Sequence, residues 1–470
     1  MQRISIIVLF LSFLLVAVSC SSPTKITSFK PEPDDAVPLA YDNSPSYINL
    51  PISLQLKDIE NKTNSLLNGL IYEDTIIEDD NIEVKIWKVA PIQFENIASQ
   101  NDNGKLKTTV PLKVTVRYRI GTTKLGIQLY NTKEFNLNGV VTLISDVDLS
   151  NWKLSTTTKF QSIEWNESPT MKLLGKNIPV TFLINSSLPL FKAKIERKID
   201  ESISKSMDFK PNVLSALEKI ALPFQISQEY ESWLRVTPLE IYSTNAKLVG
   251  ESIHINMGLK CTIETLIGKK PETKFNANAI ILKAVTSIPN AITANITSVS
   301  TYQDASTLIT KNFAGQEFVA GKKKIKVQNA TIWHKKGKLI IALDVTGNVN
   351  GSIYLTGVPK YNETSKEIYF DQMDYALETK NKLLQTANWL AQGIILKKIE
   401  ANCRYSIRQN LEEGKKNIEG YLKNYSPLSG VYVNGNIGNI QFKKIQLTNQ
   451  ALLAYLKIDG EIKITINGLK

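Results

Sequence analysis

The chain has 470 residues, of which 43% are hydrophobic and 21% are charged, and its formal net charge is +12. This length is too great for one ordinary hydrophobic core and indicates two domains of similar size. The composition, with no low-complexity tract, excludes a largely disordered chain. We therefore expect a folded protein with a large core.

The first residues have the layout of an export signal. Gln2 and Arg3 precede an apolar run over residues 4–18, which leads into the sequence Ala-Val-Ser-Cys ending at Cys20. A cysteine directly after a small residue resembles the bacterial lipobox, although Ala17 stands where leucine is more common. In a lipobox the thiol takes a diacylglycerol and the cysteine becomes the new N-terminus. We predict a signal peptide over residues 1–19 and a lipidated Cys20; a plain signal peptide with a coincidental cysteine is the alternative.

The sequence after Cys20 predicts a protein that is tethered to a membrane and does not span it. No later segment offers eighteen consecutive apolar residues. Residues 20–46 are rich in Ser, Pro and Asp and are interpreted as a flexible tether. We expect a periplasm-facing lipoprotein of the bacterial cell envelope, anchored in the outer membrane. Nucleic acid is not expected as a partner of an exported protein, and the lysine pairs of the second half indicate either a solvated surface or attraction to anionic headgroups.

The first half of the chain predicts a curved sheet around a helix. Alternating residues indicate strands over residues 81–92, 105–120, 135–144 and 152–160, which are long for a flat sheet and favour a strongly curved one. A helix is expected over residues 189–207, with a further helical piece to residue 220, and strands return over residues 233–263.

The second half predicts the same order of elements. One long helix is expected over residues 394–422, with apolar residues at a strict spacing of four, and an alternating strand over residues 451–466. The stretch beginning at Gly104 and the stretch beginning at Gly337 both leave a Gly-Lys-Leu turn into such a strand. We interpret the chain as a duplication in an α+β protein, each module being a long curved antiparallel sheet around a long amphipathic helix. The modules are predicted over residues 47–280 and 281–470.

The polar residues do not predict catalysis or a metal site, and no cofactor is expected. The two histidines, His254 and His334, are far apart and are interpreted as surface residues. The acidic pairs, Glu164 with Glu167 and Asp371 with Asp374, are the only candidates for a carboxylate-dependent hydrolase, and a solvated surface is the expected role for them. Cys261 and Cys403 lie on apolar faces and are expected to be buried thiols, with a disulfide as the alternative.

The chain resembles the domain of unknown function 4403 family of exported bacterial lipoproteins over nearly everything after Cys20. The resemblance rests on LPISLQL near the start, IEWNESPTMKLLGKNIPV around Trp165, WLRVTP at Trp233, and GSIYLTGVPKY leading on to ANWL at Trp389. It implies an envelope location but no reaction. The architecture is similar to the tubular lipid-binding fold of bactericidal/permeability-increasing proteins, which implies an apolar groove for acyl chains between helix and sheet.

Three hypotheses follow for function. The first is a non-enzymatic protein that binds or shields a lipid or another apolar ligand between the helices and the curved sheets. The second is a scaffolding lipoprotein whose apolar faces close on each other, and the third is the envelope hydrolase. For the first, the candidate groove residues are Ile195, Ile199, Ile203, Met257, Ile395, Ile399, Cys403, Ile407 and Leu411.

Overall fold

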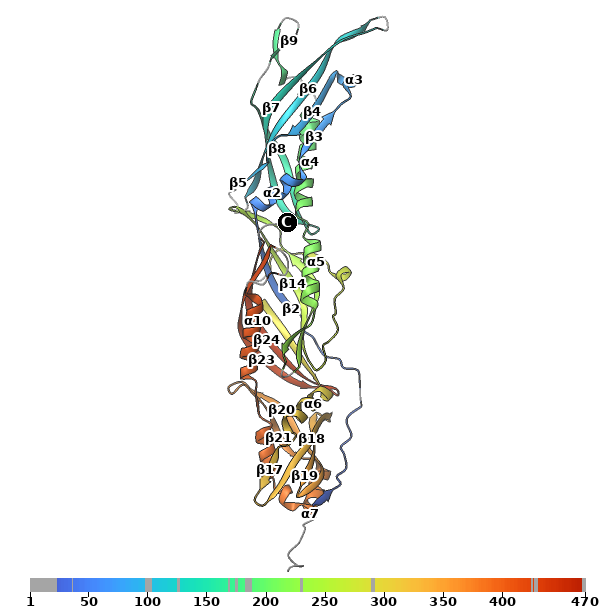
Figure 1. Ribbon diagram of the computed structural model, residues 1–470, viewed down its shortest axis with the longest axis vertical. Helices are drawn as coiled ribbons and strands as arrows, with labels where there is room; N and C mark the ends of the chain where they lie inside the picture. The colour runs from blue at the N-terminus through green and yellow to red at the C-terminus, as the bar shows by residue number, and fades with distance from the viewer. Residues whose placement is uncertain are drawn as a thin grey trace, which may run out of the picture.

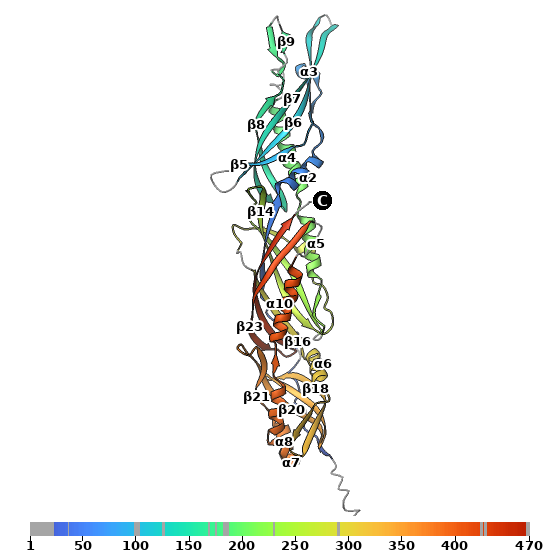
Figure 2. The same cartoon turned by 60° about the vertical axis from the view of Figure 1, so that its left-hand side comes forward.

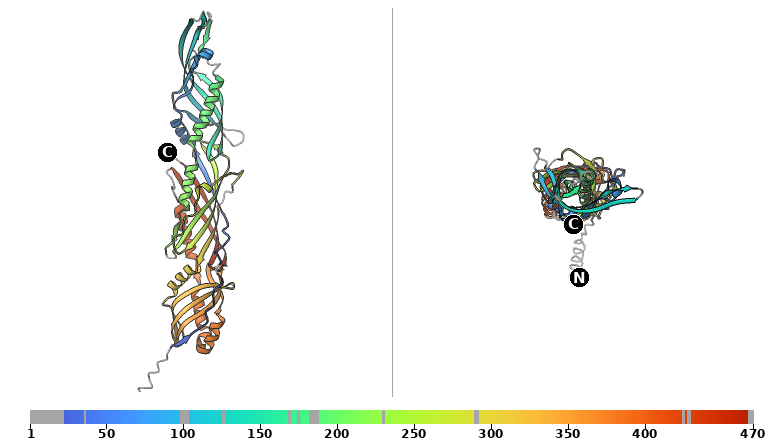
Figure 3. Two further views of the ribbon diagram at one scale, coloured as in Figure 1. Left: turned by 90° about the vertical axis from the view of Figure 1, so that its right-hand side faces the viewer. Right: turned by 90° about the horizontal axis from the view of Figure 1, so that it is seen from above.

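The computed structural model describes residues 23–35, 37–97, 104–124, 127–167, 170–173, 176–181, 188–228, 231–288, 292–423, 426 and 430–466. Cys20 and the predicted signal peptide therefore lie outside the described residues. The chain forms an elongated rod of three consecutive parts (Figures 1 and 2). We name them the upper lobe, the middle part and the lower lobe after their positions in Figure 1. Seen from above, the three parts superimpose along one axis (Figure 3).

The upper lobe is a curved antiparallel sheet that packs on helix α4. Its strands run in the order β3-β4-β6-β7-β8, and β5 pairs with the start of β6. Alternation fixes its inner face, because Val114 and Val116 have no exposed surface while Lys113 and Arg117 of the same strand are exposed. The elements are α2 (Leu56–Leu66), β3 (Gly69–Asp74), α3 (Ile77–Asp80), β4 (Ile82–Lys88), β5 (Gln93–Ile97), β6 (Lys105–Lys124), β7 (Ile127–Ser150), β8 (Lys153–Trp165), β9 (Thr170–Leu173), β10 (Lys176–Pro179) and α4 (Leu188–Ser206).

Helix α4 confirms the first predicted amphipathic helix within one residue at each end. Its apolar stripe, which lies against the sheet without any exposed surface, consists of Ile195, Ile199 and Ile203. On the neighbouring face Asp200 accepts hydrogen bonds from the hydroxyls of Thr156 and Thr158 on β8, at 2.6 and 2.5 Å. The helix is therefore held to the sheet by apolar packing and by a polar clamp beside it.

The middle part is one sheet that contains strands from both halves of the chain. Its main order is β11-β12-β14-β16-β2-β24-β23, and helices α5 and α10 lie on it. The pairs β14–β16 and β2–β24 are parallel, so the expectation of purely antiparallel sheets is wrong for this part. The elements are β2 (Ser46–Gln55), α5 (Lys210–Ala221), β11 (Phe224–Ser227), β12 (Ser232–Ser243), β13 (Lys247–Val249), β14 (Ser252–Ile267), η2 (Ala277–Ala279), β15 (Leu282–Ala284), β16 (Ile292–Thr301), α10 (Arg408–Leu422), β23 (Val431–Leu447) and β24 (Ala451–Ile466).

The lower lobe repeats the helix-on-sheet arrangement with a second curved sheet. Strands β17-β18-β19-β20-β21-β22 follow one another in space, and β1 pairs in parallel with the start of β20, on the side opposite β19. Ile395 and Ile399 of α9 are fully buried in its core. The elements are β1 (Thr24–Ile26), α6 (Tyr302–Phe313), β17 (Glu317–Ala320), β18 (Lys323–Lys335), β19 (Lys338–Gly347), β20 (Val349–Asn362), β21 (Glu367–Tyr375), α7 (Leu377–Thr386), α8 (Asn388–Ala391), α9 (Ile394–Asn402) and β22 (Tyr405–Ser406).

These parts confirm an α+β protein with curved sheets. The predicted module boundary at residue 280 does not separate two sheets, because β2 and β14 lie before it, β16 and β24 lie after it, and all four share the middle sheet. No helix in the described part of the chain is long and apolar enough to cross a membrane.

The predicted single helix over residues 394–422 is wrong. Helix α9 ends at Asn402, a short strand pairs with β21, and α10 starts at Arg408. The physical reason is geometric: side chains four apart drift by about 40° per step, so five of them turn through roughly 160° and cannot all face one flat partner. At the break the backbone N–H of Ile407 donates to the carbonyl of Lys366 at 2.8 Å.

The other helical segment breaks in the same way. Helix α4 ends at Ser206, the backbone N–H of Phe209 donates to the carbonyl of Trp152 at 2.8 Å, and α5 starts at Lys210. In both segments the first helix packs in a lobe and the second in the middle part. Each helical segment therefore bends where a lobe joins the middle part.

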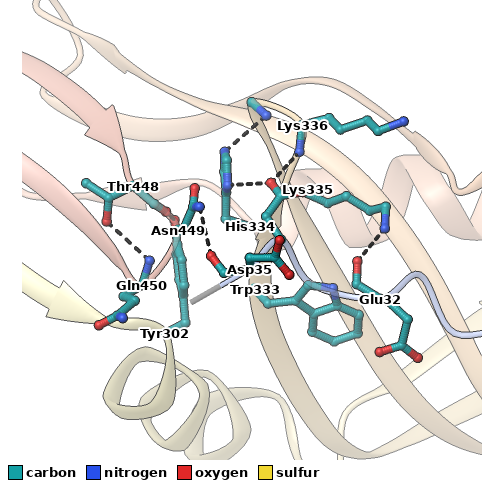
Figure 4. Close-up of polar contacts among 12 residues, drawn as sticks. Glu32, Asp35, Tyr302, Trp333, His334, Lys335, Lys336, Thr448, Asn449 and Gln450 are labelled. Carbon is teal, nitrogen blue, oxygen red and sulfur yellow. Dashed lines mark hydrogen bonds and ion pairs between the residues drawn. The ribbon is translucent and has the colours of Figure 1, made fainter. Parts of the chain in front are cut away.

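The predicted flexible tether is also wrong for its described residues, which dock along the rod. We name residues 23–35 and 37–45 the N-terminal strap. Its strand β1 buries Ile26 in the lower lobe. Beyond β1 the indole of Trp333 donates to the carbonyl of Pro31 at 2.9 Å. Asn449 donates to the carbonyl of Asp35 at 3.0 Å, as Figure 4 shows. Serine, proline and aspartate offer few apolar contacts, but here the backbone carbonyls of the segment supply the binding groups.

Higher on the rod the strap meets a buried ion pair. Arg235 and Glu264 are register partners on β12 and β14, are 6% and 4% exposed, and lie 2.8 Å apart from Nη2 to Oε2. The hydroxyl of Tyr41 donates to the other carboxylate oxygen of Glu264, and burial together with this bond raises the pKa of Tyr41. The strap therefore supplies the hydrogen-bond donor for the carboxylate oxygen of Glu264 that Arg235 does not contact.

We expect the stripe isoleucines to be structural. Ile199→Ala or Ile399→Ala should lower the free energy of unfolding by roughly 2–5 kcal/mol, because each leaves a cavity in a closed core. Leu190→Ala is the control, since Leu190 is on α4 but 63% exposed, and it should change stability by no more than about 0.5 kcal/mol. Urea denaturation followed by circular dichroism measures the difference; equal effects at the three sites would contradict the packing described.

We also expect the strap to depend on Tyr41. Tyr41→Phe removes one hydrogen bond to a buried carboxylate and should cost about 1.5–3 kcal/mol locally, so that residues 37–45 exchange their amide hydrogens faster. Tyr432→Phe, at a tyrosine that is 43% exposed on β23, is the matched control. Unchanged exchange in Tyr41→Phe would mean that other contacts hold the strap.

Candidate functional site

The middle sheet presents one face that is apolar from strand to strand. The registers place its inward residues opposite one another: Leu259 lies between Ile241 and Ile48, and Ile296 lies opposite Leu456. Because side chains alternate along each strand, this continuity puts the apolar residues of all these strands on the same side. The face belongs to one hydrophobic cluster, which we name the middle cluster.

Two helices cover this face from opposite sides. Helix α5 contributes Leu214 and Leu217, and α10 contributes Ile418 and Leu422. Figures 1 and 2 show α5 and α10 along opposite margins of the middle part. Leu422 packs closely on β23, where a Cβ added to Gly435 would lie 3.3 Å from its Cδ1. The middle part is thus a sheet with two helices along its margins.

The middle cluster is less tightly closed than the two other large clusters. We name these the upper cluster, which joins the upper lobe to residues 52–54 and 248–257 of the middle sheet, and the lower cluster, which lies in the lower lobe. Of its 14 buried apolar residues only Cys261 has no exposed surface, whereas 18 of 34 in the upper cluster and 11 of 21 in the lower cluster have none. Around the middle cluster the partly buried residues include Leu214, Ile418, Ile440 and Leu456. The side chains of the middle cluster are therefore less completely excluded from solvent than those of the other two clusters.

The predicted groove residues lie mostly elsewhere. Those without exposed surface in the upper and lower clusters are Ile195, Ile199, Ile203, Ile395 and Ile399, and Met257 is 2% exposed in the upper cluster. Cys403 is half-buried after α9, Ile407 is 9% exposed at the helix break, and Leu411 is half-buried on α10. The structure does not bring them together beside one groove.

The carboxylates considered for hydrolysis sit on the surface. Glu164 and Glu167 are exposed, and Asn138 donates to Glu167 at 3.3 Å. Asp371 pairs with Lys360, whose hydrogen bond lowers the pKa of the carboxyl group, and Asp374 lies 2.9 Å from the ammonium of Lys380. In the described residues no three His, Cys, Asp or Glu side chains group closely enough to hold a metal ion.

The prediction that both histidines are surface residues holds for His254 and is wrong for His334. His334 is 9% exposed because the strap covers it: its Nδ1 lies 2.9 Å from an oxygen of Asp34. Its Nε2 accepts a hydrogen bond from the backbone N–H of Gly337 at 3.0 Å. The imidazole therefore lies between a backbone N–H of its own turn and a carboxylate of the strap. Figure 4 shows the ring enclosed by the turn beside the strap.

The two cysteines of the described residues are free thiols. Cys261 lies in the middle cluster and Cys403 beside the lower cluster, so the disulfide alternative is wrong. Burial raises the pKa of each thiol to about 12, which keeps both protonated at neutral pH. Cys261 is fully buried as expected, whereas Cys403 is half-buried.

A shallow polar depression of about 850 Å³ lies where the lower end of the middle sheet meets α6. The indole of Trp233 donates to the carbonyl of Gly268 at 3.1 Å on its wall, and the ammonium of Lys270 lies 5.6 Å from the ring centre. It is lined by Gln225, Gln228, Glu231, Trp233, Gly268, Lys269, Lys270 and Lys311. This lining does not suit an acyl chain.

Sequence reasoning found the β24 side of the middle face and the helical piece that forms α5, but it did not separate α10 from α9. The alternation that includes Leu456 and Ile458 was visible, whereas Ile418 and Leu422 lay in the predicted helix without being recognised as an apolar pair of their own. A signal was present, since Ile418 and Leu422 are four apart and Lys415 and Lys416 separate them from Leu411.

Comparison with known proteins places the chain in a family. No curated protein sequence matches it. A solved structure that is similar is titled "Crystal structure of lipopolysaccharide binding protein", with 9% sequence identity over 90% of this chain and 99% of that chain. The TM-score of 0.23 is too low for this likeness to carry an argument. The model of the family described as "Domain of unknown function (DUF4403)" matches residues 44–466, and the chain therefore belongs to that family.

Proposed function

We propose that this protein binds an apolar ligand, of the size of a lipid acyl chain, on the middle face between α5 and α10. The observation that carries the proposal is the contrast in closure: the middle cluster has one fully excluded residue in 14, whereas about half of the residues in each of the upper and lower clusters are fully excluded. An apolar face that lies between two helices and keeps some exposed surface offers area for an alkyl chain. The proposed site is thus centred on α5, α10 and the middle sheet, whereas most of the groove residues expected from the sequence lie on α4 and α9.

The closed lobes support a mechanical role around this site. Side chains without exposed surface leave no room for a ligand beside α4 or α9. The lobes then hold the middle sheet at both ends, and the helix breaks at residues 207–209 and 403–407 allow α5 and α10 to take their own angle over the sheet. We further infer that α4–α5 and α9–α10 are copies of one unit, which is supported by their shared order and their matching breaks.

The proposal includes the place of the protein in the cell. We infer that the chain is exported, that Cys20 carries the lipid anchor, and that the body faces the periplasm from the outer membrane. No enzymatic step is part of the proposed function, because the candidate carboxylates lie exposed or in surface ion pairs. The partners are the anchoring membrane and the apolar ligand.

A scaffold is the second candidate, and the rod shape with closed lobes favours it. In that case the middle cluster is closed in solution by small side-chain movements, and the protein acts as a rigid spacer. The two candidates differ in whether the middle part takes up a ligand, and the following experiments separate them.

We expect the non-acylated mature chain, Cys20→Ser, to bind a fluorescent fatty acid. A stoichiometric rise in probe fluorescence, together with the matching mass in native mass spectrometry, measures uptake. Leu456→Gln should weaken binding by about tenfold or more, because it places an amide on the apolar face. A protein that takes up no acyl probe would exclude the ligand-binding function and favour the scaffold.

A matched pair of substitutions tests whether the middle face is open. Leu456→Phe adds volume on β24 and should change stability by less than about 1 kcal/mol while reducing probe binding. Leu112→Phe makes the same change at a residue of β6 without exposed surface, and overpacking there should cost about 1–3 kcal/mol. Denaturant titration of both variants gives the comparison. Equal destabilisation at the two sites would indicate that the middle face is as closed as the upper lobe.

A further inference from the structure

Three segments meet at the end of the lower lobe that lies farthest from the middle part. The backbone N–H of Thr24 in β1 donates to the carbonyl of Asn348 at 3.1 Å, and Asn348 donates to the carbonyl of Lys324 at 3.0 Å. Helix α7 lies beside β1 at the same end (Figures 1 and 2). The start of the strap, the β17–β18 turn and α7 therefore form one terminal surface.

Helix α7 exposes two large apolar side chains on this surface. Leu377 is 71% exposed and Leu384 is 53% exposed, and residues seven apart lie on the same face of a helix. The opposite face holds the helix to the lobe, since Thr379 and Leu383 have no exposed surface. This amphipathic helix is thus packed on one side and has an apolar edge without cover on the other.

Exposed basic side chains lie on the other two segments of this terminal surface. Lys322 in the β17–β18 turn, Lys323 at the start of β18 and Lys25 in β1 are exposed, whereas Lys324 pairs with Glu317 at 3.1 Å. On α7 the exposed Glu378 is the opposing charge, and Lys380 pairs with Asp374. Exposed leucines with exposed lysines are the combination that interfacial helices use on anionic lipid surfaces.

We propose that this terminal surface docks on the membrane that holds the anchor, with Leu377 and Leu384 at the level of the headgroups and Lys25, Lys322 and Lys323 against anionic lipid. The inference rests on the proposed lipidation of Cys20. Cys20 precedes Thr24 by four residues, which span at most about 14 Å, and β1 is paired into the lobe from Thr24 onward. A lipidated Cys20 therefore holds α7 within reach of the bilayer, and the rod stands with its upper lobe away from the membrane.

The test uses the acylated full-length protein in vesicles. A polarity-sensitive dye is attached at Leu384→Cys, and the control is Leu190→Cys on α4 in the upper lobe. Cys261 is buried, and the half-buried Cys403 is replaced by serine in both variants so that it takes no dye. With vesicles that contain phosphatidylglycerol, the dye at position 384 should shift to the blue and be quenched by spin-labelled lipid, and the dye at position 190 should not. The double variant Lys322→Glu, Lys323→Glu should reduce the fraction of protein whose dye at position 384 is protected from water at least several-fold. The reason is that each lysine is expected to contribute about fivefold to the affinity for anionic lipid.

The outcomes distinguish docking from anchoring. Acylated protein that floats with the vesicles while the dye at position 384 stays in water would overturn docking and leave the anchor intact. Protein whose N-terminal mass shows no diacylglycerol and which does not float would overturn both. Protection that needs no vesicles and grows with protein concentration would assign the face to a second copy of the chain and also overturn the inference. Fatty-acid uptake by the Cys20→Ser chain is independent of all three results.

Discussion

The pairing of β24 with strands from the first half of the chain holds the rod together. β24 runs antiparallel to β16 along ten residue pairs and parallel to β2 at its far end. Without these ladders the lower lobe, which the chain completes before β23, would be joined to the rest mainly through the start of α6 and the strap. Each ladder is regular along an alternating sequence, so a slip by one residue would turn the inward leucines and isoleucines to solvent. This register therefore fixes both the continuity of the middle face and the relative positions of the lobes.

The bent helices follow from the same arrangement. A helix that began in a lobe and continued straight would carry its apolar side chains progressively around its axis and away from the sheet. Both helical segments instead stop at the edge of their lobe, give one backbone hydrogen bond to a neighbouring segment and restart over the middle sheet. The restart lets α5 and α10 approach the middle face from its margins, and it leaves the face between them less closed than the cores of the lobes.

Much of this fold could be predicted because periodicity is local. Helix α4 and strand β24 agree with their predicted ranges to within a residue, since their apolar spacing distinguishes one face from the other. The docking of the strap could not be predicted from composition, because it uses backbone carbonyls of the strap itself. The side chains that donate to these carbonyls, such as those of Trp333 and Asn449, are hundreds of residues away in the sequence. His334 was misplaced for the same reason. The candidate site was missed in part because a groove is a property of packing between helices, which spacing along one helix does not reveal.

The long-range pairing of the strap and β2 also sets an order for folding. Ser28 bonds a residue 324 positions later, and Asp35 one 414 positions later. A chain made from its N-terminus leaves the strap without its partners on β20 and beside β24 until most of the chain exists, although β2 can pair with β14 once residue 261 is made. The sheet closes only when the last strand, β24, arrives. Such non-local closure slows folding, and until that moment the edges of β2 and β16 are open to unintended pairing. The architecture suits a chain that stays unfolded until synthesis is complete, with β24 as the element that ends that period.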